Sequence, residues 1–463
     1  MPKSVQEAVP VQTIYDDGIF KVGTDRYSRT YRFSDINYSV ASYDDKMDML
    51  QNYMSLINSL DSEAKITINN RRLNRHDFER DTLLKEKDDN LNKFRKEYNQ
   101  MLLAKATGGN TIVQEKYITI TVSEQNVEDA SQALQRIGTG LSVQLGRLGS
   151  TSEELDAAER LRILHDFYRY GEEVLFRTDI DEKRRRGHDI KDYVCPDHME
   201  IHKDYIMIGE RYARVLFLKE YASFISDDFV TKIMDRKQNM MLSIDITPVS
   251  MGEALRDVEK RLLGIDTNIT QWQRRQNANN NFTAEVPYDM ELQRKQLREF
   301  LDDLQTRDQR MMLATLTLVH TADTLEELNR NTKAIQAVGQ ESLCQIGILK
   351  IQQLDGLNTV LPVGDKKLCL SRTLTTEALS AFVPFRVQDV KHTHGIYYGQ
   401  NVESRNMIIA DRRNLLNGNS FILGVSGSGK SFAAKSEITN LMLSSDADII
   451  ILDPEREVRQ EVA

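Results

Sequence analysis

Cysteine is nearly absent from the chain, which has three in 463 residues: Cys195, Cys344 and Cys369. None of them has a partner at CxxC spacing, so the sequence excludes a zinc ribbon and a disulfide framework and fits a reducing cytoplasm. Long apolar runs are also missing, and no stretch approaches the roughly 18 residues that a membrane-spanning helix needs. Residues 1–18 lack the apolar core of a signal peptide, so we do not expect export by the general secretory route.

Proline and glycine are sparse, with 8 and 23 residues, and no low-complexity linker separates parts of the chain. At roughly 150 residues per domain, we expect about three domains that pack against one another. The 61 basic and 70 acidic residues give a formal net charge of −9, which argues against nucleic-acid binding over the whole surface. The basic run at 183–186 is either a solvated loop or a local contact for nucleic acid or anionic lipid.

Two stretches of the chain show the same order of strand, helical hairpin, strand and helix. This order suggests an internal duplication, and two similar α+β units that arose by coincidence are the alternative. The first stretch has alternating strands at 64–69 and 117–122 and an amphipathic helix at 126–148 that begins at Ser123 or Asn126. The second stretch has strands at 241–246, 312–319 and 344–351 and helices at 250–276, 289–309 and 324–338.

The residues between the first two strands predict one long polar helix. Leu84, Leu91, Phe94, Tyr98 and Met101 recur at the spacing of a narrow apolar seam, as in a helical hairpin. We expect each hairpin to project from a sheet, which is a shape suited to contacts with neighbouring molecules.

The C-terminal segment carries the most informative motif. Residues 424–431 read GVSGSGKS and match the phosphate-binding pattern G-x-x-x-x-G-K-[ST], the P-loop. Residues 421–423 predict a short apolar strand directly before the motif, and 431–443 predict a helix after it. Phe432, Ile438, Leu441 and Met442 are available for a buried face of this helix. Because strand, glycine loop and helix is the setting that this motif requires, we expect nucleotide binding here rather than a chance match.

Each position of the loop has its own physical role. Gly427 and Gly429 allow backbone angles that other residues resist, so that successive N–H groups form a nest for the β-phosphate. The helix N-terminus adds partial positive charge. We expect Lys430 to reach the β- and γ-phosphates of ATP and the Ser431 hydroxyl to ligate Mg²⁺. The expected nucleotide-binding residues are Gly424, Val425, Ser426, Gly427, Ser428, Gly429, Lys430 and Ser431.

A second apolar run, at 447–452, ends in Asp453 and looks like a Walker B strand. In many motor-type P-loop folds the strand directly after the first helix does not bind the metal, and Pro454 replaces the usual acidic partner. Asp453 is therefore either a magnesium-binding acid or, as we favour, a strand-end residue near the nucleotide or a capping residue.

The segment at 394–424, the P-loop and the IILDPERE sequence after it resemble the conjugal transfer ATPases of type IV secretion. These are TraE/TrbE-like proteins, the fourth component of VirB-type systems, within the HerA–FtsK group. The openings IYDDGIF at 14–20 and YSRTYRFSDINYSVAS at 27–42 resemble Gram-positive members. The resemblance implies an N-terminal region that docks on a secretion channel at the inner face of the membrane and a RecA-like motor that works as an oligomer, commonly a hexamer. DNA or a relaxase is the substrate that it implies.

In that family the motor domain continues far beyond the P-loop, and the Walker B pair, the sensor and the neighbour's arginine lie there. We therefore expect this chain to be a fragment or a truncated gene product that does not hydrolyse ATP by itself, and its catalytic residues stay unknown. The predicted fold is an α+β N-terminal region followed by the start of a RecA-like α/β domain. The expected domains are an α+β unit at 1–150, a mostly helical connector with short strands at 151–240, a second α+β unit with a helical hairpin at 241–385 and the incomplete ATPase domain at 386–463.

Three functions follow from these observations. The first is an energy-transducing ATPase of conjugative type IV secretion, which drives channel assembly or substrate transfer. The second is a structural subunit that binds nucleotide without turnover, and the third is a DNA translocase of the same superfamily.

His392 and His394 have no carboxylate or cysteine at ligand spacing, so we expect a loop there rather than a metal site.

Overall fold

The computed structural model describes residues 4–72, 74–108, 112–176, 189–222, 224–236, 238–279, 281, 285–415 and 417–452. The chain divides into two compact units: Met1–Asn70 with Gln114–Arg386, and Arg71–Val113 with Val387–Ala463. The second unit thus joins two segments that are far apart in the sequence. One of them begins next to residue 386, where a domain start is expected, whereas the other lies inside the unit expected at 1–150.

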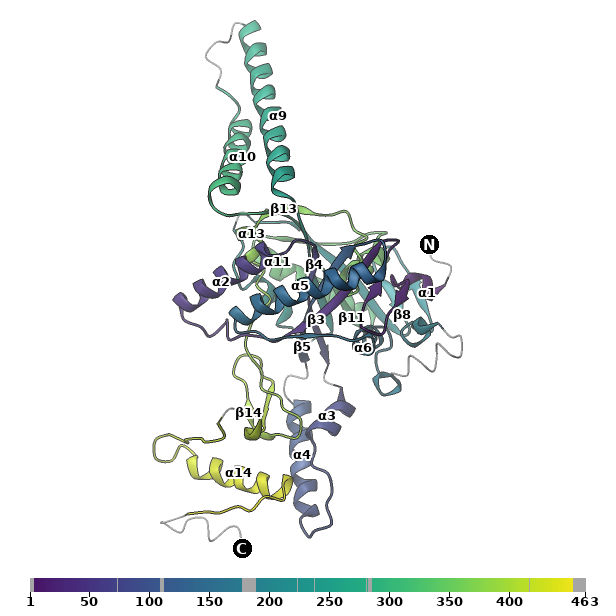
Figure 1. The fold of residues 1–463 in the computed structure, drawn as a ribbon, viewed down its shortest axis with the longest axis vertical. Helices are drawn as coiled ribbons and strands as arrows, with labels where there is room; N and C mark the ends of the chain where they lie inside the picture. Colours follow the sequence, from purple (N-terminus) through teal and green to yellow (C-terminus); the bar gives the residue numbers. More distant parts are fainter. Residues whose placement is uncertain are drawn as a thin grey trace. The chain divides into compact units, whose positions relative to one another are not determined.

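One large antiparallel sheet forms the centre of the first unit (Figure 1). Its strands are β1 (Thr13–Ile14), β2 (Phe20–Lys21), β3 (Arg26–Phe33), β4 (Glu63–Arg72), β5 (Ile112–Ser123), β6 (Ser152–Glu154), β7 (Met199–Ile201), β8 (Ile206–Ile208), β9 (Arg211–Glu220), β10 (Met240–Pro248), β11 (Met311–Ala322), β12 (Gln345–Ile348) and β13 (Arg372–Thr375). Among the described residues the order is β1-β2-β3-β5-β4-β10-β11-β9-β8-β7, with β6, β12 and β13 paired to β3, β9 and β11.

The helices of this unit begin and end close to the predicted positions. Asn126, rather than Ser123, caps the helix after β5 by accepting a hydrogen bond from the Asp129 N–H, and Thr324 caps the helix after β11 in the same way. The helices are α1 (Val5–Ala8), α2 (Tyr43–Asn58), α5 (Val127–Arg147), α6 (Ala157–Tyr168), α8 (Phe229–Met234), α9 (Met251–Ala278), α10 (Tyr288–Thr306), α11 (Leu325–Glu341), α12 (Gln353–Val360) and α13 (Thr376–Ser380).

The two halves of the sheet have the same connectivity. The first half runs β3, α2, β4, two helices, β5, α5, β6 and α6, and the second runs β9, α8, β10, two helices, β11, α11, β12 and α12. β6 pairs with β3 as β12 pairs with β9. From the central β4–β10 pair outward, the order is β4, β5, β3 in the first half and β10, β11, β9 in the second. Corresponding strands thus take the same places in the two halves, as the duplication hypothesis requires.

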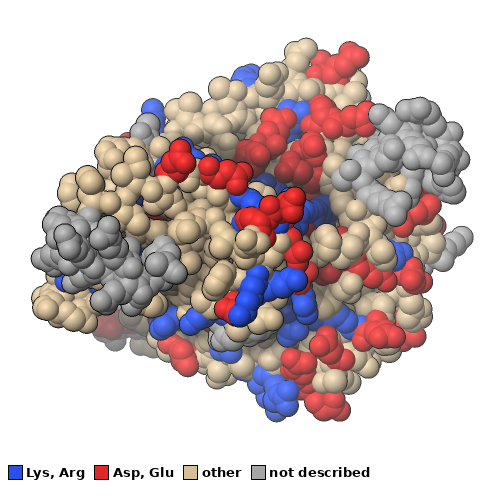
Figure 2. Space-filling model, turned by 90° about the horizontal axis from the view of Figure 1, so that it is seen from below, with Lys and Arg blue, Asp and Glu red and all other residues tan. Residues whose placement is uncertain are grey.

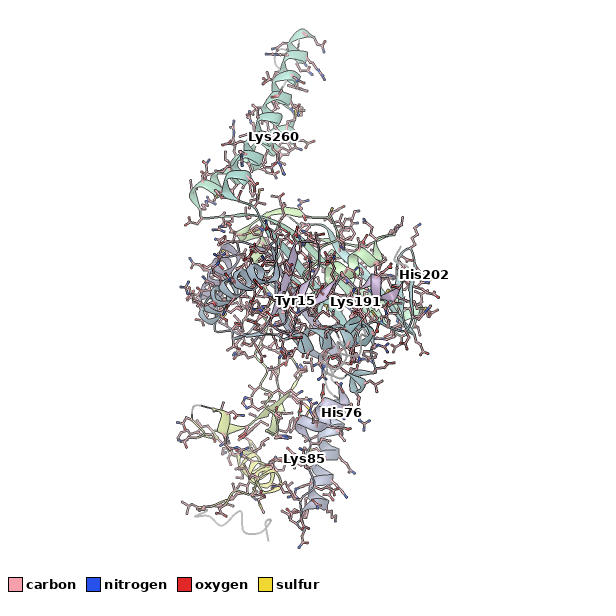
Figure 3. The ribbon with its side chains drawn as sticks, turned by 45° about the vertical axis from the view of Figure 1, so that its right-hand side comes forward. Tyr15, His76, Lys85, Lys191, His202 and Lys260 are labelled. Atoms are coloured by element: carbon pink, nitrogen blue, oxygen red, sulfur yellow. The ribbon has the colours of Figure 1, made fainter. Side chains whose placement is uncertain are left out.

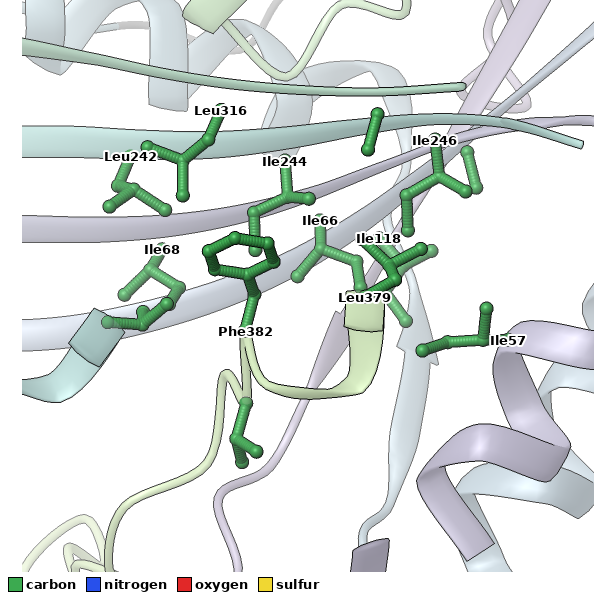
Figure 4. Packing of buried hydrophobic residues seen from close by; sticks show 14 of the residues in the cluster. Ile57, Ile66, Ile68, Ile118, Leu242, Ile244, Ile246, Leu316, Leu379 and Phe382 are labelled. Atoms are coloured by element: carbon green, nitrogen blue, oxygen red, sulfur yellow. The ribbon is translucent and has the colours of Figure 1, made fainter. Parts of the chain in front are cut away.

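Alternation along the strands sends apolar side chains to one face of the sheet. Ile66 of β4, Ile118 of β5, Ile244 of β10 and Leu316 of β11 share one buried cluster with Phe382 (Figure 4). α2, α5, α8 and α11 contribute buried residues to the same cluster. This cluster is the largest hydrophobic cluster in the described part of the unit.

The opposite face of the central strands carries hydroxyl groups that are also buried. Thr67 of β4 and Ser243 of β10 lie with their oxygens 2.9 Å apart. The segment at 359–365 crosses this face, and its carbonyl oxygens accept hydrogen bonds from strand side chains, including Ser28 to Val363 (2.5 Å). Because the hydroxyl groups find acceptors in this crossing segment, both faces of the strands can be buried.

α9 and α10 lie side by side and extend away from the sheet, as expected for the second hairpin (Figure 1). Val258 and Leu304 are buried in the cluster at its base. Lys260, on α9, lies among the side chains that surround the hairpin in Figure 3.

The second unit contains α3 (Arg75–Thr82), α4 (Asn92–Gly108), β14 (Ile396–Gln400), β15 (Met407–Ala410) and α14 (Lys430–Ser444). The single long helix predicted around Leu84 and Leu91 is wrong, because the chain between α3 and α4 is irregular. Phe94 and Met101 of the expected seam are 52% and 38% exposed. The irregular turn is held by polar side chains, since Asn99 bonds both the N–H and the carbonyl of Leu84.

The connector expected at 151–240 was to be mostly helical with short strands, but its residues 199–220 belong to the central sheet. These residues form β7, β8 and β9. Val215 and Leu216, neighbours on β9, are buried in the clusters on opposite faces of the sheet, as expected for a strand inside it. The basic run at 183–186 lies outside the described residues.

On the face shown in Figure 2, acidic and basic side chains are interspersed, and a group of lysine and arginine residues borders acidic ones. This face therefore offers no broad field of one sign. None of the helices in the described ranges combines the length and the apolar composition of a membrane-spanning helix.

Candidate functional site

The glycine loop at 424–431 lies directly before α14 and has the backbone geometry that its sequence predicts. Gly427 and Gly429 have φ angles of 79° and 88°, in the left-handed region that favours glycine. A Cβ atom at Gly424 would lie 2.5 Å from the Ser428 hydroxyl oxygen, so a side chain there would require this hydroxyl to move. The Ser428 N–H closes a turn onto the Val425 carbonyl at 3.2 Å.

Gly429 is the N-cap of α14, and no side chain caps this helix end. The first intrahelical bond runs from the Ala433 N–H to the Gly429 carbonyl, at 2.9 Å. The first N–H groups of an α-helix point away from its hydrogen-bond ladder, and the helix dipole adds positive potential at the same place. An anion such as a phosphate group fits this end of the helix.

Lys430 and Ser431 occupy the first turn of α14, as the motif requires. The Lys430 ammonium donates a hydrogen bond to the Val425 carbonyl oxygen at 2.8 Å, which folds its side chain back over the loop. Ser431 is exposed. A lysine and a hydroxyl on one exposed helix turn are the donor set that a magnesium-bound triphosphate uses.

The expected strand at 421–423 does not form in the described part of the chain. Phe421 and Leu423 are 91% and 88% exposed, and Leu452 of the second expected strand is 92% exposed. A strand needs a neighbour for its N–H and C=O groups, and no described strand pairs with either segment. Asp453 lies outside the described residues, so its role stays a prediction.

The buried face of α14 also differs from the expected one. Asn440 and Leu443 are the buried residues of the helix. Of the expected face, Ile438 and Leu441 are half-buried, whereas Phe432 is 78% and Met442 39% exposed. The helix is held on its other side by polar contacts rather than by an apolar stripe.

Glu437, in the middle of α14, connects the helix to the hairpin of β14 and β15. Its carboxylate accepts a hydrogen bond from the Tyr398 hydroxyl at 2.8 Å and pairs with Arg412 at 2.7 Å. Burial first, and then the Glu437 carboxylate, raise the pKa of Tyr398. This contact fixes the rotation of α14 about its axis.

The two candidate histidines take part in loop contacts. His392 Nδ1 accepts a hydrogen bond from the Asp411 N–H at 3.0 Å, and His394 has a φ of 57° with its N–H bonded to the Asp81 carbonyl. Within the described ranges, no group of three or more histidine, cysteine or acidic side chains is arranged to hold a metal ion.

Cavities are present in the first unit as well. One of about 430 Å³ is lined by residues 11–16 and 189–191, with Tyr15 and Lys191 on its wall (Figure 3).

Sequence reasoning identified the loop but missed the residues that hold its helix. Glu437 and Arg412 are an ordinary charge pair in sequence, and the 71–113 segment carries no motif. The apolar seam predicted for that segment suggested a hairpin that projects from the sheet. In the structure, Leu102 of this segment instead packs in one cluster with Ile409 of β15.

No known protein family matches the chain by its sequence profile, and no curated protein sequence matches it.

Proposed function

We propose that the chain is the ATP-binding, energy-transducing subunit of a conjugative type IV secretion system. The observation that carries this proposal is the glycine loop at 424–431, with Gly427 and Gly429 in left-handed conformations directly before the uncapped N-terminus of α14. The geometry supports nucleotide binding, and the resemblance of the segments at 14–20, 27–42 and 394–424 supports the secretion system.

ATP with Mg²⁺ is the ligand of this site under the proposal. The first-turn amides of α14 and Lys430 would hold the phosphates, and the Ser431 hydroxyl would hold the metal ion. Magnesium-bound ATP supplies the free energy of phosphoryl transfer. The residues at 424–431 bind and orient the phosphates.

The proposed partners are other subunits of the secretion channel at the inner face of the cell membrane, further copies of this chain in a hexamer, and DNA or a relaxase as substrate. The peripheral location of the family supports the membrane contact. The projecting α9–α10 pair supports contacts with neighbouring subunits, because it leaves the sheet with both helices largely exposed.

A structural subunit that binds nucleotide without turnover is the second candidate. It is favoured by the size of the sheet unit, which makes up most of the chain and contains no catalytic motif. A DNA translocase of the same superfamily is a third candidate, which the interspersed charges of Figure 2 do not favour.

The test is the binding of a fluorescent ATP analogue with Mg²⁺ to the full chain. We expect saturable binding that Lys430→Ala abolishes, because the ammonium contacts the phosphates. Lys435→Ala removes the same charge from the same helix outside the loop and should leave binding unchanged. Equal affinity in Lys430→Ala would refute the site.

Phosphate release then separates the candidate functions. Turnover by the chain, alone or with its channel partners, supports the energy-transducing subunit, and nucleotide binding without turnover supports the structural one. Salt-dependent DNA binding with a steep slope would favour the translocase.

A further inference from the structure

Arg95 of α4 contacts the last turn of α14 from inside the second unit. Its Nε donates a hydrogen bond to the Leu443 carbonyl oxygen at 2.9 Å, and its side chain is 1% exposed. The last carbonyls of a helix have no intrahelical donor, and a cation is favoured at this end of the helix dipole. Arg95 therefore caps the end of α14 that lies opposite the glycine loop.

The guanidinium of Arg95 is held in place before it reaches α14. The two terminal nitrogens of Arg95 donate hydrogen bonds to the Asp89 carboxylate, at 2.5 and 2.6 Å. One of them also donates to the Asn92 side-chain oxygen, at 2.8 Å. A forked contact of this kind fixes the plane of the guanidinium. The turn between α3 and α4 thus sets the orientation of the guanidinium. The Leu443 carbonyl of α14 accepts a hydrogen bond from a donor that is already fixed in place.

Neighbouring residues of the same segment contact the same end of α14. Lys87 pairs with Asp446 at 2.7 Å, just beyond the helix. Tyr98 of α4 lies beside Asn440, one of the two buried residues of α14, and burial raises the pKa of its hydroxyl to about 12. The C-terminal end of α14 is therefore held by residues 87–98, while Glu437 holds its middle through β14 and β15.

A helix transmits a displacement of one end to the other because its hydrogen bonds make it a stiff rod. α14 has 15 residues, so its ends are about 22 Å apart. A change in the position of the last turn must shift the first turn, where Lys430 and Ser431 lie. The amides of that turn must point at one place to hold a phosphate.

We propose that Arg95 is a positioning residue for the nucleotide site, and that the inserted segment at 75–108 regulates nucleotide affinity by anchoring the far end of α14. This inference rests on the proposed nucleotide binding at 424–431. Because coupling between two sites is reciprocal, nucleotide binding must in turn order the insertion. The segment at 75–108 is continuous in sequence with β4 on one side and β5 on the other.

The experiment measures the affinity of the full chain for a fluorescent ATP analogue in the wild type, Arg95→Ala and Lys96→Ala. Lys96 is the matched control, since it lies next to Arg95 on α4 with its side chain 66% exposed. We expect affinity about tenfold weaker in Arg95→Ala and unchanged in Lys96→Ala, within the usual range of coupling. Arg95→Lys keeps the charge but loses the fork, and should fall between them.

Amide hydrogen exchange in α4, with and without ATP, is the second measurement. If Arg95 only stabilised the fold, ATP would not change the exchange of α4. In the wild type, ATP should slow exchange in α4, which carries no loop residue. This protection should be absent in Lys430→Ala and strongly reduced in Arg95→Ala.

The outcomes separate the two proposals. Wild-type affinity in Arg95→Ala, or no protection of α4 by bound ATP, overturns the linkage and leaves the nucleotide site intact. No binding by the wild type overturns the proposed nucleotide binding and the linkage with it. If Arg95→Ala does not fold, Arg95→Lys and the exchange of wild-type α4 decide the question.

Discussion

Lys65 of β4 and Asp245 of β10 face each other across the centre of the sheet, with the ammonium nitrogen 3.4 Å from a carboxylate oxygen. Their side chains are 3% and 6% exposed. Lys65 also donates to the carbonyls of Leu361 and Asp365, at 3.2 and 2.9 Å, in the segment that crosses this face. One ion pair thus joins the first half of the sheet, the second half and the crossing segment.

Asp245→Asn should destabilise the first unit by roughly 3–5 kcal/mol, because it leaves the Lys65 ammonium buried without its counter-charge. Urea unfolding at pH 7 measures the effect. Asp257→Asn is the control, since Asp257 pairs with Arg261 on the exposed face of α9, where such pairs contribute about 0–1 kcal/mol. Equal losses in the two variants would contradict a special role for the buried pair.

The stability of the first unit should fall as the pH is lowered from about 6.5, because His320 is buried in a neutral form. Burial, and then the nearby Arg214 guanidinium, lower the pKa of His320 to about 3. The unfolded chain takes up a proton between these values and the folded chain does not, so stability is full above pH 6.5 and is lost toward pH 3. At pH 5 the loss should be about 2 kcal/mol.

Chemical denaturation at pH 7 and pH 5 tests this. His320→Gln should flatten the difference between the two pH values, and His76→Gln, at an exposed position, should not. A wild-type profile that stays flat from pH 7 to pH 5 would show that His320 takes up a proton in the folded chain as readily as in the unfolded chain.

Asp89 should make the second unit acid-sensitive. The hydrogen bonds from Arg95, followed by the N–H of Leu91, lower the pKa of Asp89 to about 2. Because the folded pKa lies below the unfolded value of about 3.9, the stabilisation is present above that value and is lost as the pH falls to about 2. Pepsin cleavage within 92–108 should therefore rise between pH 4 and pH 2.

The matched variants are Asp89→Asn and Asp88→Asn. Asp89→Asn should be cleaved in this segment already at pH 4, with little further change on acidification. Asp88→Asn removes a neighbouring exposed charge and should behave as the wild type. Identical behaviour of the two variants would argue that Asp89 does not hold Arg95 in solution.

Gly364→Ala should be among the most destabilising small changes in the crossing segment. Gly364 has a φ of 87°, and an added Cβ would lie 2.5 Å from both the Ser28 Cβ and the Thr121 hydroxyl oxygen. We expect a loss of about 2–4 kcal/mol from backbone strain plus overpacking. Gly209→Ala, with a φ of 56° and no atom near the added Cβ, isolates the backbone part, about 1–2 kcal/mol.

Thermal unfolding of both glycine variants gives the comparison. A similar loss in the two would mean that the crossing segment moves away from β3 and β5 at little cost.

Alternation and helical periodicity predicted most elements of the first unit correctly. The strands at 64–69, 117–122, 241–246 and 312–319 are present, and so are α5, α9, α10 and α11. Period two is set by the geometry of the extended backbone, so it can be read without knowledge of the neighbours. Helical periodicity failed between Leu84 and Leu91, where Asn and Asp side chains stabilise an irregular turn before α4 begins at Asn92.

Alternation could not show that the hydroxyl face is buried. A strand such as β5 reads as half-exposed, yet Thr119 and Thr121 are 0% and 6% exposed, because the crossing segment supplies carbonyl acceptors for them. Those acceptors come from residues more than 200 positions later in the chain, at a separation that no local pattern reports.

The sequence by itself determined the local elements and the glycine loop, because backbone geometry and the freedom of Gly427 and Gly429 depend on a few adjacent residues. Only the tertiary structure decided that β4 pairs with β10 and that Arg95 caps α14. These contacts depend on which distant groups can exclude water together and satisfy one another's hydrogen bonds. The sequence does not distinguish a buried arginine such as Arg95 from an exposed one, because burial depends on the residues that the fold brings around it.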